Sequence, residues 1–229
     1  MAGLSAVLDH VPLLLAFGWV VRMPGISPDE GHEAITRAAF NGLDLTDAQH
    51  AALIRGVRAP DASIRGLAVF ALPSRQPRHA LRAWYSTTTT EGVKALRAFV
   101  VAHHGRALGA TDDRRRWERF GEVLHCLQDA YSPAHVDRDG PRILRMKHWG
   151  VLDRRHAGAG GPDEHGFPTD GRDRALVDGS LVPAASDAAR VSHAYLVLAL
   201  RHVSSPATAA VARRQDVDAF LDALVTGPQ

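Results

Sequence analysis

A histidine and an aspartate stand four residues apart in the segment 121–135, which reads GEVLHCLQDAYSPAH. His125 and Asp129 are expected on one face of a helix, because positions i and i+4 are neighbours on a helix surface. His135 follows ten residues after His125, just past Pro133. An imidazole nitrogen and a carboxylate oxygen held side by side are ligands that a zinc ion accepts readily. The spacing therefore predicts a zinc site near the end of this helix.

The cysteine and histidine content limits what kind of metal site the chain can build. Cys126 is the only cysteine among 229 residues, so a disulfide or a cysteine zinc cluster cannot form within one chain. Histidine, the commonest metal ligand, occurs 13 times. A metal site built from histidine and carboxylate indicates a catalytic role more than a structural one. Cys126 itself is expected to be a small core residue rather than a nucleophile.

The element that carries these residues is predicted to be the central helix of an all-α protein. Within residues 111–131, apolar side chains recur at three- and four-residue steps, which indicates a face turned to the core. No segment shows the alternation of a strand, and no internal repeat is present. The prediction is a single-domain helical bundle over residues 1–229. The members of the apolar stripe are Trp117, Phe120, Leu124, Leu127 and Tyr131.

Capping patterns predict where other helices begin. Ser27 to Glu30 (SPDE) predicts a helix to about Asn41, and Thr46 with Gln49 predicts a second helix to about Gly56. Residues 157–185, rich in glycine, proline and aspartate, are predicted to form a long loop. Further helices are predicted at about residues 78–85, 91–107, 186–203 and 215–225, with residues 87–90 as a loop or cap before the second of these.

The charge and the N-terminal sequence argue against nucleic-acid binding and against a membrane span. Net charge is +2, and the only lysines are Lys94 and Lys147, so the arginine content is attributed to genome composition. The uncharged run at residues 11–21 is shorter than the roughly 20 residues that a bilayer span needs. It also lacks the basic flank of a signal peptide. A buried helix and a cytoplasmic location are favoured over secretion.

The segment with His125, Asp129 and His135 resembles the signature of the zinc-dependent phospholipases C and the related single-strand nucleases. These enzymes carry His-x3-Asp-x5-His on a helix and the loop after it, and the three residues reproduce that spacing. The resemblance implies an all-α fold of the phospholipase C/nuclease type. It also implies two or three Zn²⁺ ions and hydrolysis of a phosphoester by metal-activated water.

The resemblance extends loosely over residues 17–153 and implies further ligands upstream. His32 in HEAIT matches the histidine at the start of the family's upstream helix, and Asp61 and His79 match its loop aspartate and next histidine. Asp61, His79, His125 and Asp129 would then complete a first metal site. Asp129 would bridge to a neighbouring ion that His32 also holds. Asp61 and Asp129 are accordingly the expected catalytic residues.

Two departures from the family pattern concern the remaining ligands. The best-known members bind a metal through an N-terminal tryptophan, whereas Trp19 lies inside this chain, so either another ligand such as Asp29 or Glu30 substitutes or that site is weak or absent. The opening FGWVVRMPGISPDEGHEAIT is similar to the heterokaryon-incompatibility C-type branch, which lacks that tryptophan terminus. Downstream, the family pairs a histidine with a carboxylate four residues on, but His148 has Asp153 five residues on.

The expected ligands of the downstream ion are His135, His148 and Asp153, with His156 as an alternative to the latter two. The remaining helical histidines stand without carboxylate spacing and are predicted to be structural; they are His103, His104, His193 and His202. Glu122 lies one turn before His125, and is either a support for that ring or a surface acid.

Two functions from different classes fit the sequence. The first is a zinc-dependent hydrolase of a phospholipid, nucleotide or small biosynthetic phosphoester. Nucleic acid is not favoured, because aromatic content is only 6% and stacking platforms for bases are scarce. The alternative is a catalytically inactive, metal-stabilised binding protein of the same fold. A plainer third possibility is a helical domain whose histidines bind nothing. The substrate and the oligomeric state stay open.

Overall fold

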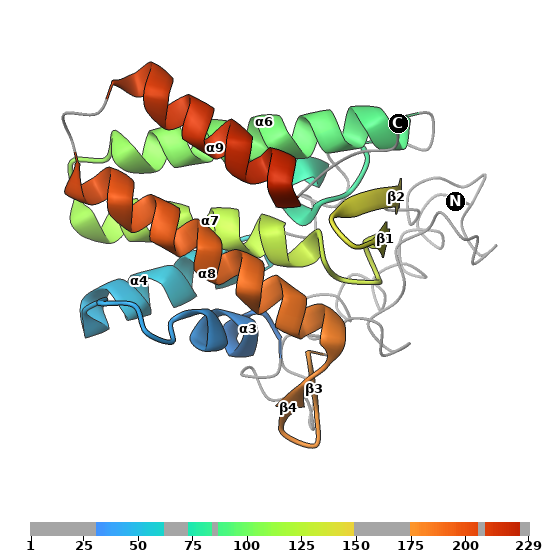
Figure 1. Ribbon diagram of the computed structural model, residues 1–229, viewed down its shortest axis with the longest axis horizontal. Helices are drawn as coiled ribbons and strands as arrows, with labels where there is room; N and C mark the ends of the chain where they lie inside the picture. The colour runs from blue at the N-terminus through green and yellow to red at the C-terminus, as the bar shows by residue number, and fades with distance from the viewer. Residues whose placement is uncertain (1–30, 62–72, 84–86, 149–174, 206–208, 225–229) are drawn as a thin grey trace, which may run out of the picture.

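The computed structural model describes residues 31–61, 73–83, 87–148, 175–205 and 209–224 (Figure 1). Within these residues the chain is mostly helical, as predicted, with two small antiparallel sheets. The helices are α3 (His32–Ala39), α4 (Asp47–Arg58), the 3₁₀ helix η2 (Pro73–His79), α6 (Thr89–Leu108), α7 (Asp113–Asp129), α8 (Pro183–Ser204) and α9 (Ala210–Leu224). The strands are β1 (Val136–Asp139), β2 (Arg142–Met146), β3 (Leu176–Val177) and β4 (Ser180–Leu181).

Helix α7 lies at the centre of the bundle, between α6 and the α3–α4 pair, with α8 crossing it (Figure 1). Its predicted apolar stripe is buried, since Trp117, Phe120 and Leu124 are at most 1% exposed. Because α7 contacts α3, α4, η2, α6 and α8, a residue at its C-terminal end can meet side chains from several other elements.

Helices α4 and α7 approach each other backbone to backbone at a pair of glycines. A Cβ atom on Gly56 would lie 1.9 Å from the carbonyl oxygen of Glu118. A Cβ atom on Gly121 would lie 2.4 Å from the carbonyl oxygen of Leu53. Any larger residue would therefore separate the two helices, and the close packing brings the C-terminal end of α4 against the middle of α7.

The capping box predicted for α4 is present, and α6 begins with a second capping box. Thr46 accepts a hydrogen bond from the Gln49 amide at 3.3 Å, and the Gln49 side chain accepts one from the Thr46 amide at 2.9 Å. Thr88 and Glu91 make the same reciprocal pair at the start of α6. These bonds satisfy amides that have no partner within the helix.

The helix predicted over residues 78–85 is wrong. The 3₁₀ helix η2 ends at His79, and Ala80 then adopts the left-handed region with φ of 49°. After this turn the next residues run beside the C-terminal end of β2. There the Arg82 amide donates to the Lys147 carbonyl at 2.8 Å. A long-range backbone pairing has replaced the local helix, and it fixes the position of His79.

The prediction that the chain lacks strands is also wrong. Strands β1 and β2 form a hairpin directly after α7, turning at Gly140 with φ of 55°. Charged residues occupy both strands, and a register shift between Asp137 and Arg138 interrupts the ladder, so the sequence shows no clean alternation. The hairpin holds His135 at the base of β1, because the Lys147 amide donates to the His135 carbonyl at 2.8 Å.

The predicted loop at residues 157–185 ends earlier than expected. A second hairpin, β3–β4, turns through Asp178 and Gly179 at positive φ, and α8 begins at Pro183 instead of Ser186. Proline at the first helical position suits a helix start, because its missing N–H has no acceptor there. The remaining predictions for residues 157–174 and 11–30 lie outside the described residues. No described helix is long and apolar enough to cross a membrane.

Candidate metal centre

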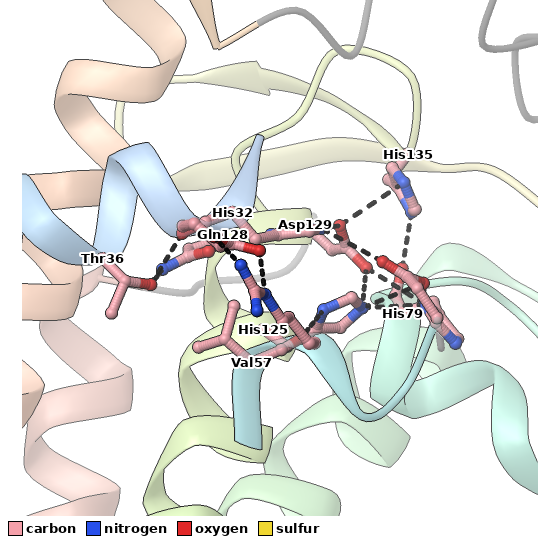
Figure 2. A network of polar contacts seen from close by, with 11 residues as sticks. His32, Thr36, Val57, His79, His125, Gln128, Asp129 and His135 are labelled. Carbon is pink, nitrogen blue, oxygen red and sulfur yellow. Dashed lines mark hydrogen bonds and ion pairs between the residues drawn. The ribbon is translucent and has the colours of Figure 1, made fainter. Parts of the chain in front are cut away.

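The predicted ligands on separate elements meet at the C-terminal end of α7 (Figure 2). His125 and Asp129 lie on α7, and His32 is the first residue of α3. Donor atoms within 4.8 Å of one another form two groups: His32 with His125 and Asp129, and Asp61 with His79 and His125. Asp61 follows α4, His79 ends η2, and His135 precedes β1.

The buried Asp129 carboxylate occupies the middle of this cluster. Its Oδ2 lies 3.1 Å from His125 Nε2 and 3.3 Å from His79 Nδ1. Its Oδ1 lies 3.2 Å from His32 Nε2 and 3.5 Å from His135 Nε2. The two carboxylate oxygens therefore face two different pairs of imidazoles, as Figure 2 shows.

Asp61 supplies a second carboxylate beside the same rings. Its Oδ1 lies 3.7 Å from His79 Nδ1 and 3.8 Å from His125 Nε2, and its Oδ2 lies 3.9 Å from His32 Nε2. The Asp61 side chain is 34% exposed, against 3% for Asp129. Asp61 thus forms the solvent-accessible side of the cluster.

Backbone carbonyls fix the proton positions of His125 and His135. The Val57 carbonyl lies 2.9 Å from His125 Nδ1, and the His79 carbonyl lies 2.6 Å from His135 Nδ1. A carbonyl oxygen can only accept, so each Nδ1 must carry the hydrogen. In the neutral ring the Nε2 atom then presents a lone pair, and both lone pairs are directed at Asp129.

In this arrangement the Nε2 lone pairs of neutral His125 and His135 face the buried, negatively charged carboxylate of Asp129. Asp129 Oδ2 receives no hydrogen bond from the residues that the structure describes. Burial opposes ionisation of Asp129, but the positive charge that the His135, His125 and His32 rings carry when protonated outweighs it and holds the Asp129 pKa well below the usual range. Burial likewise opposes the charged form of His32, yet Asp129 and Asp61 raise the pKa of His32 to about 10. Cations between the rings and the carboxylates, either protons or metal ions, would therefore stabilise the cluster.

The donor set and its spacing fit zinc. Zinc ligands stand about 2.0–2.2 Å from the ion, so two ligands of a tetrahedral site lie about 3.3 Å apart. The four nitrogen-to-oxygen separations at Asp129 span 3.1 to 3.5 Å. Neutral imidazole nitrogen and carboxylate oxygen are also the donors that zinc takes in catalytic sites.

His148 does not join these groups. His148 is buried just after β2, where its backbone pairs with Arg82, but neither metal-ligand group among the described residues contains it. Asp153 and the alternative His156 lie outside the described residues, as do the proposed substitutes Asp29 and Glu30.

The sequence interpretation missed Gln128. This residue is 2% exposed, and its Oε1 lies 2.8 Å from His32 Nδ1. A signal was present, since Gln128 is a polar residue on a helix whose neighbouring positions are apolar or ligands. Glu122, considered as a support for His125, instead pairs with His103 at 3.2 Å.

The histidines predicted to be structural lie away from the cluster, and two of them form a separate network. His104 Nδ1 lies 3.0 Å from the Tyr195 hydroxyl, and His104 Nε2 lies 2.9 Å from His202 Nδ1. His202 Nε2 continues the chain to Asp216 Oδ2 at 3.0 Å. Burial, with His202 and Arg213 nearby, lowers the pKa of His104 to about 3. The network ties α6 and α8 to α9 and uses neutral His104.

Cys126 is a core residue, as predicted. It is 0% exposed, and its thiol donates to the Pro77 carbonyl at 3.1 Å across the contact between α7 and η2. Burial, reinforced by Asp129, raises the pKa of the thiol. A protonated, enclosed thiol is unsuited to nucleophilic attack.

No family model, curated protein or solved structure matches this chain. The functional assignment therefore depends on the chemistry of the cluster.

Proposed function

We propose that this protein is a zinc-dependent hydrolase of phosphoesters with a carboxylate-bridged metal cluster. The observation that supports this most is the Asp129 carboxylate. Each of its oxygens faces its own pair of imidazole nitrogens at 3.1 to 3.5 Å, a spacing suited to ligands of a shared ion. A bridging carboxylate of this kind is typical of two-metal sites that act on phosphate esters.

The proposed ligands divide between two ions. Asp61, His79, His125 and Asp129 Oδ2 would hold one ion, and Asp129 Oδ1 would share the other with His32 and His135. His148 and Asp153 remain the expected additional ligands of the second ion or of a third, with His156 as the alternative.

The charge of the cluster suits an anionic substrate. Its imidazoles are neutral as ligands, and Asp61 and Asp129 supply the only carboxylates of the two described metal-ligand groups. Bound divalent ions would neutralise the phosphoester oxygens and lower the pKa of the attacking water. In this proposal Asp61, which is 34% exposed, would accept a proton from that water at a carboxylate oxygen. The buried surroundings of Asp129 strengthen every charge interaction at the cluster.

Metal analysis combined with a substrate panel tests the proposal. The panel contains a chromogenic phosphodiester, a chromogenic phosphomonoester, phosphatidylcholine micelles and single-stranded DNA. We expect zinc-dependent turnover of at least one phosphoester, lost on chelation and restored by zinc. A soluble phosphoester is favoured over DNA because Trp117 and Phe120 of α7, and Tyr131 just after it, are buried.

One observation favours the second candidate, a metal-stabilised protein without turnover. The cluster is almost closed to solvent, since the side chains of His79, His125 and Asp129 are at most 3% exposed. Among the residues of the two described groups, only Asp61 and His32 are partly exposed. Zinc binding with no turnover on the whole panel would favour this candidate and contradict the hydrolase.

A further inference from the structure

Gln128 connects the His32 ring to helices α3 and α8. Its side-chain oxygen lies 2.8 Å from His32 Nδ1. Its side-chain nitrogen donates to the Thr36 hydroxyl at 2.8 Å and to the Ser192 hydroxyl at 3.3 Å. Figure 2 shows Gln128 lying between Thr36 and His32. Three of the four residues are at most 2% exposed, so water does not compete for these bonds: Thr36, Gln128 and Ser192.

The direction of each hydrogen bond in this network follows from a single backbone carbonyl. The His32 carbonyl can only accept, so the Thr36 hydroxyl donates to it at 2.7 Å. The Thr36 oxygen must then accept from Gln128, which requires the NH₂ group of the amide to face Thr36. The amide oxygen is consequently turned to His32, and His32 Nδ1 must carry a hydrogen.

The Nδ1 partner of His32 differs in kind from those of His125 and His135, the other rings whose Nε2 faces Asp129. Backbone carbonyls hold His125 and His135, whereas a side chain holds His32. His32 is also the first residue of α3, whose N-cap Gly31 provides no side-chain cap, and its side chain is 26% exposed. The orientation of this ring therefore depends on a partner that mutation can remove.

We propose that Gln128 is a positioning residue for the His32 ion. This positioning role rests on the proposed metal cluster. It adds to the cluster a residue that does not itself bind metal. By accepting from Nδ1–H, Gln128 fixes the tautomer of His32 and directs its Nε2 lone pair at the position beside Asp129 Oδ1. Thr36 and Ser192 hold the amide in the orientation that makes this possible. Partners of ligand histidines typically contribute about 10–100-fold to metal affinity.

The test compares Gln128→Leu with Gln128→Glu. Leucine has a similar shape but no acceptor, whereas glutamate keeps an oxygen that can face His32 Nδ1. Zinc stoichiometry and affinity are measured by competition with a chromophoric chelator. We expect Gln128→Leu to weaken one of two zinc equivalents about 10–100-fold and to leave the other near its original affinity. Gln128→Glu should bind both equivalents within about threefold of the unmodified protein or more tightly.

A control and three outcomes make the test decisive. Tyr195→Phe removes a buried hydrogen bond of α8 on the far network and should leave both zinc affinities unchanged. Unaltered zinc affinities in Gln128→Leu would overturn the positioning role while leaving the metal cluster intact. Equal impairment in Gln128→Leu and Gln128→Glu would also overturn it, because the amide NH₂ that both variants lack, and not the acceptor for His32, would then matter. An unmodified protein that binds no zinc would overturn the proposed function together with this assignment.

Discussion

Gly56 and Gly121 meet where α4 crosses α7, so that a Cβ atom on Gly121 would lie only 2.8 Å from the Cα atom of Gly56. This contact sets the distance between the two helices. Val57, the residue after Gly56, can then place its carbonyl 2.9 Å from His125 Nδ1. Two residues without side-chain chemistry thereby orient a proposed metal ligand.

Gly121→Ala should destabilise the protein and disturb the cluster. Its added methyl group would meet backbone atoms, which cannot move aside as a flexible side chain can, so we expect a loss of about 1–3 kcal/mol in the free energy of unfolding. Urea denaturation measures this loss. Gly105→Ala is the matched control, because a Cβ atom there meets nothing within 4 Å and alanine favours a helix interior. Equal stabilities of the two variants would show that the α4–α7 contact can relax.

Asp129→Asn should reduce metal content by more than one ion per chain. The substitution nearly keeps the shape of the side chain but removes the negative charge that faces both imidazole pairs. Elemental analysis and turnover of the best substrate measure the effect, and turnover should fall at least about a hundredfold. Asp187→Asn, which changes an exposed aspartate paired with Arg190, is the control. Full metal occupancy in Asp129→Asn would identify Asp129 as a structural residue.

Removal of His125 should reduce the thermal stabilisation that zinc provides. Zinc that binds only the folded state raises the melting temperature by mass action. In His125→Ala the gap between zinc-loaded and chelator-treated protein should shrink at neutral pH. In His202→Ala both melting temperatures should fall, since that ring links α8 to Asp216 of α9, but the gap should persist. Identical gaps in the two variants would count against His125 as a ligand.

The metal-free protein should lose stability as the solution becomes alkaline. Asp129 raises the pKa of His32 to about 10 against the opposing effect of burial, whereas the unfolded value is about 6.5. A raised folded pKa contributes stability that is complete below about pH 6.5 and is lost as the pH rises through about 10. Thermal melts of chelator-treated protein measure this trend, and His32→Ala should flatten it. A wild-type melting temperature that stays constant from neutral to alkaline pH would contradict the assigned charge of His32.

The zinc-loaded protein should lose the stability that zinc provides as the solution becomes acidic. Ligand histidines bind metal only when neutral, so protons displace zinc as the pH falls from neutral toward about 5. The gap between zinc-loaded and chelator-treated protein should narrow over that range. Burial lowers the pKa of His104, which is not a proposed ligand, and the stability of this neutral ring is lost in both samples as the pH falls below about 6.5. Comparison of the two samples therefore isolates the contribution of zinc.

The parts of the structure that the sequence predicts are those governed by near neighbours in the chain. The capping box at Thr46, the buried stripe of α7 and the common face of His125 and Asp129 depend on residues within a few positions. The position of His79 depends on the turn at Ala80 and on pairing between Arg82 and Lys147, which no local pattern encodes.

No sequence pattern indicated that Gln128 supports the His32 ring. Gln128 lies 96 residues away along the chain, and only the packing of α3 on α7 and α8 brings it to the His32 ring. The β1–β2 hairpin was missed because its charged residues and its irregular register do not alternate between polar and apolar. Resemblance to known motifs indicated the candidate ligands, but the partners that orient them could be identified only from the fold.

Cys126 gives the protein an internal reporter of how often the cluster opens. A thiol reagent attacks the thiolate, and this thiol is enclosed, with its pKa raised by burial. Labelling must therefore wait until η2 separates from α7, the event that would also pull His79 away from His125. Since the chain has a single cysteine, the labelling rate follows this one opening. The time scale on which the cluster assembles and comes apart is thus accessible without any added probe site.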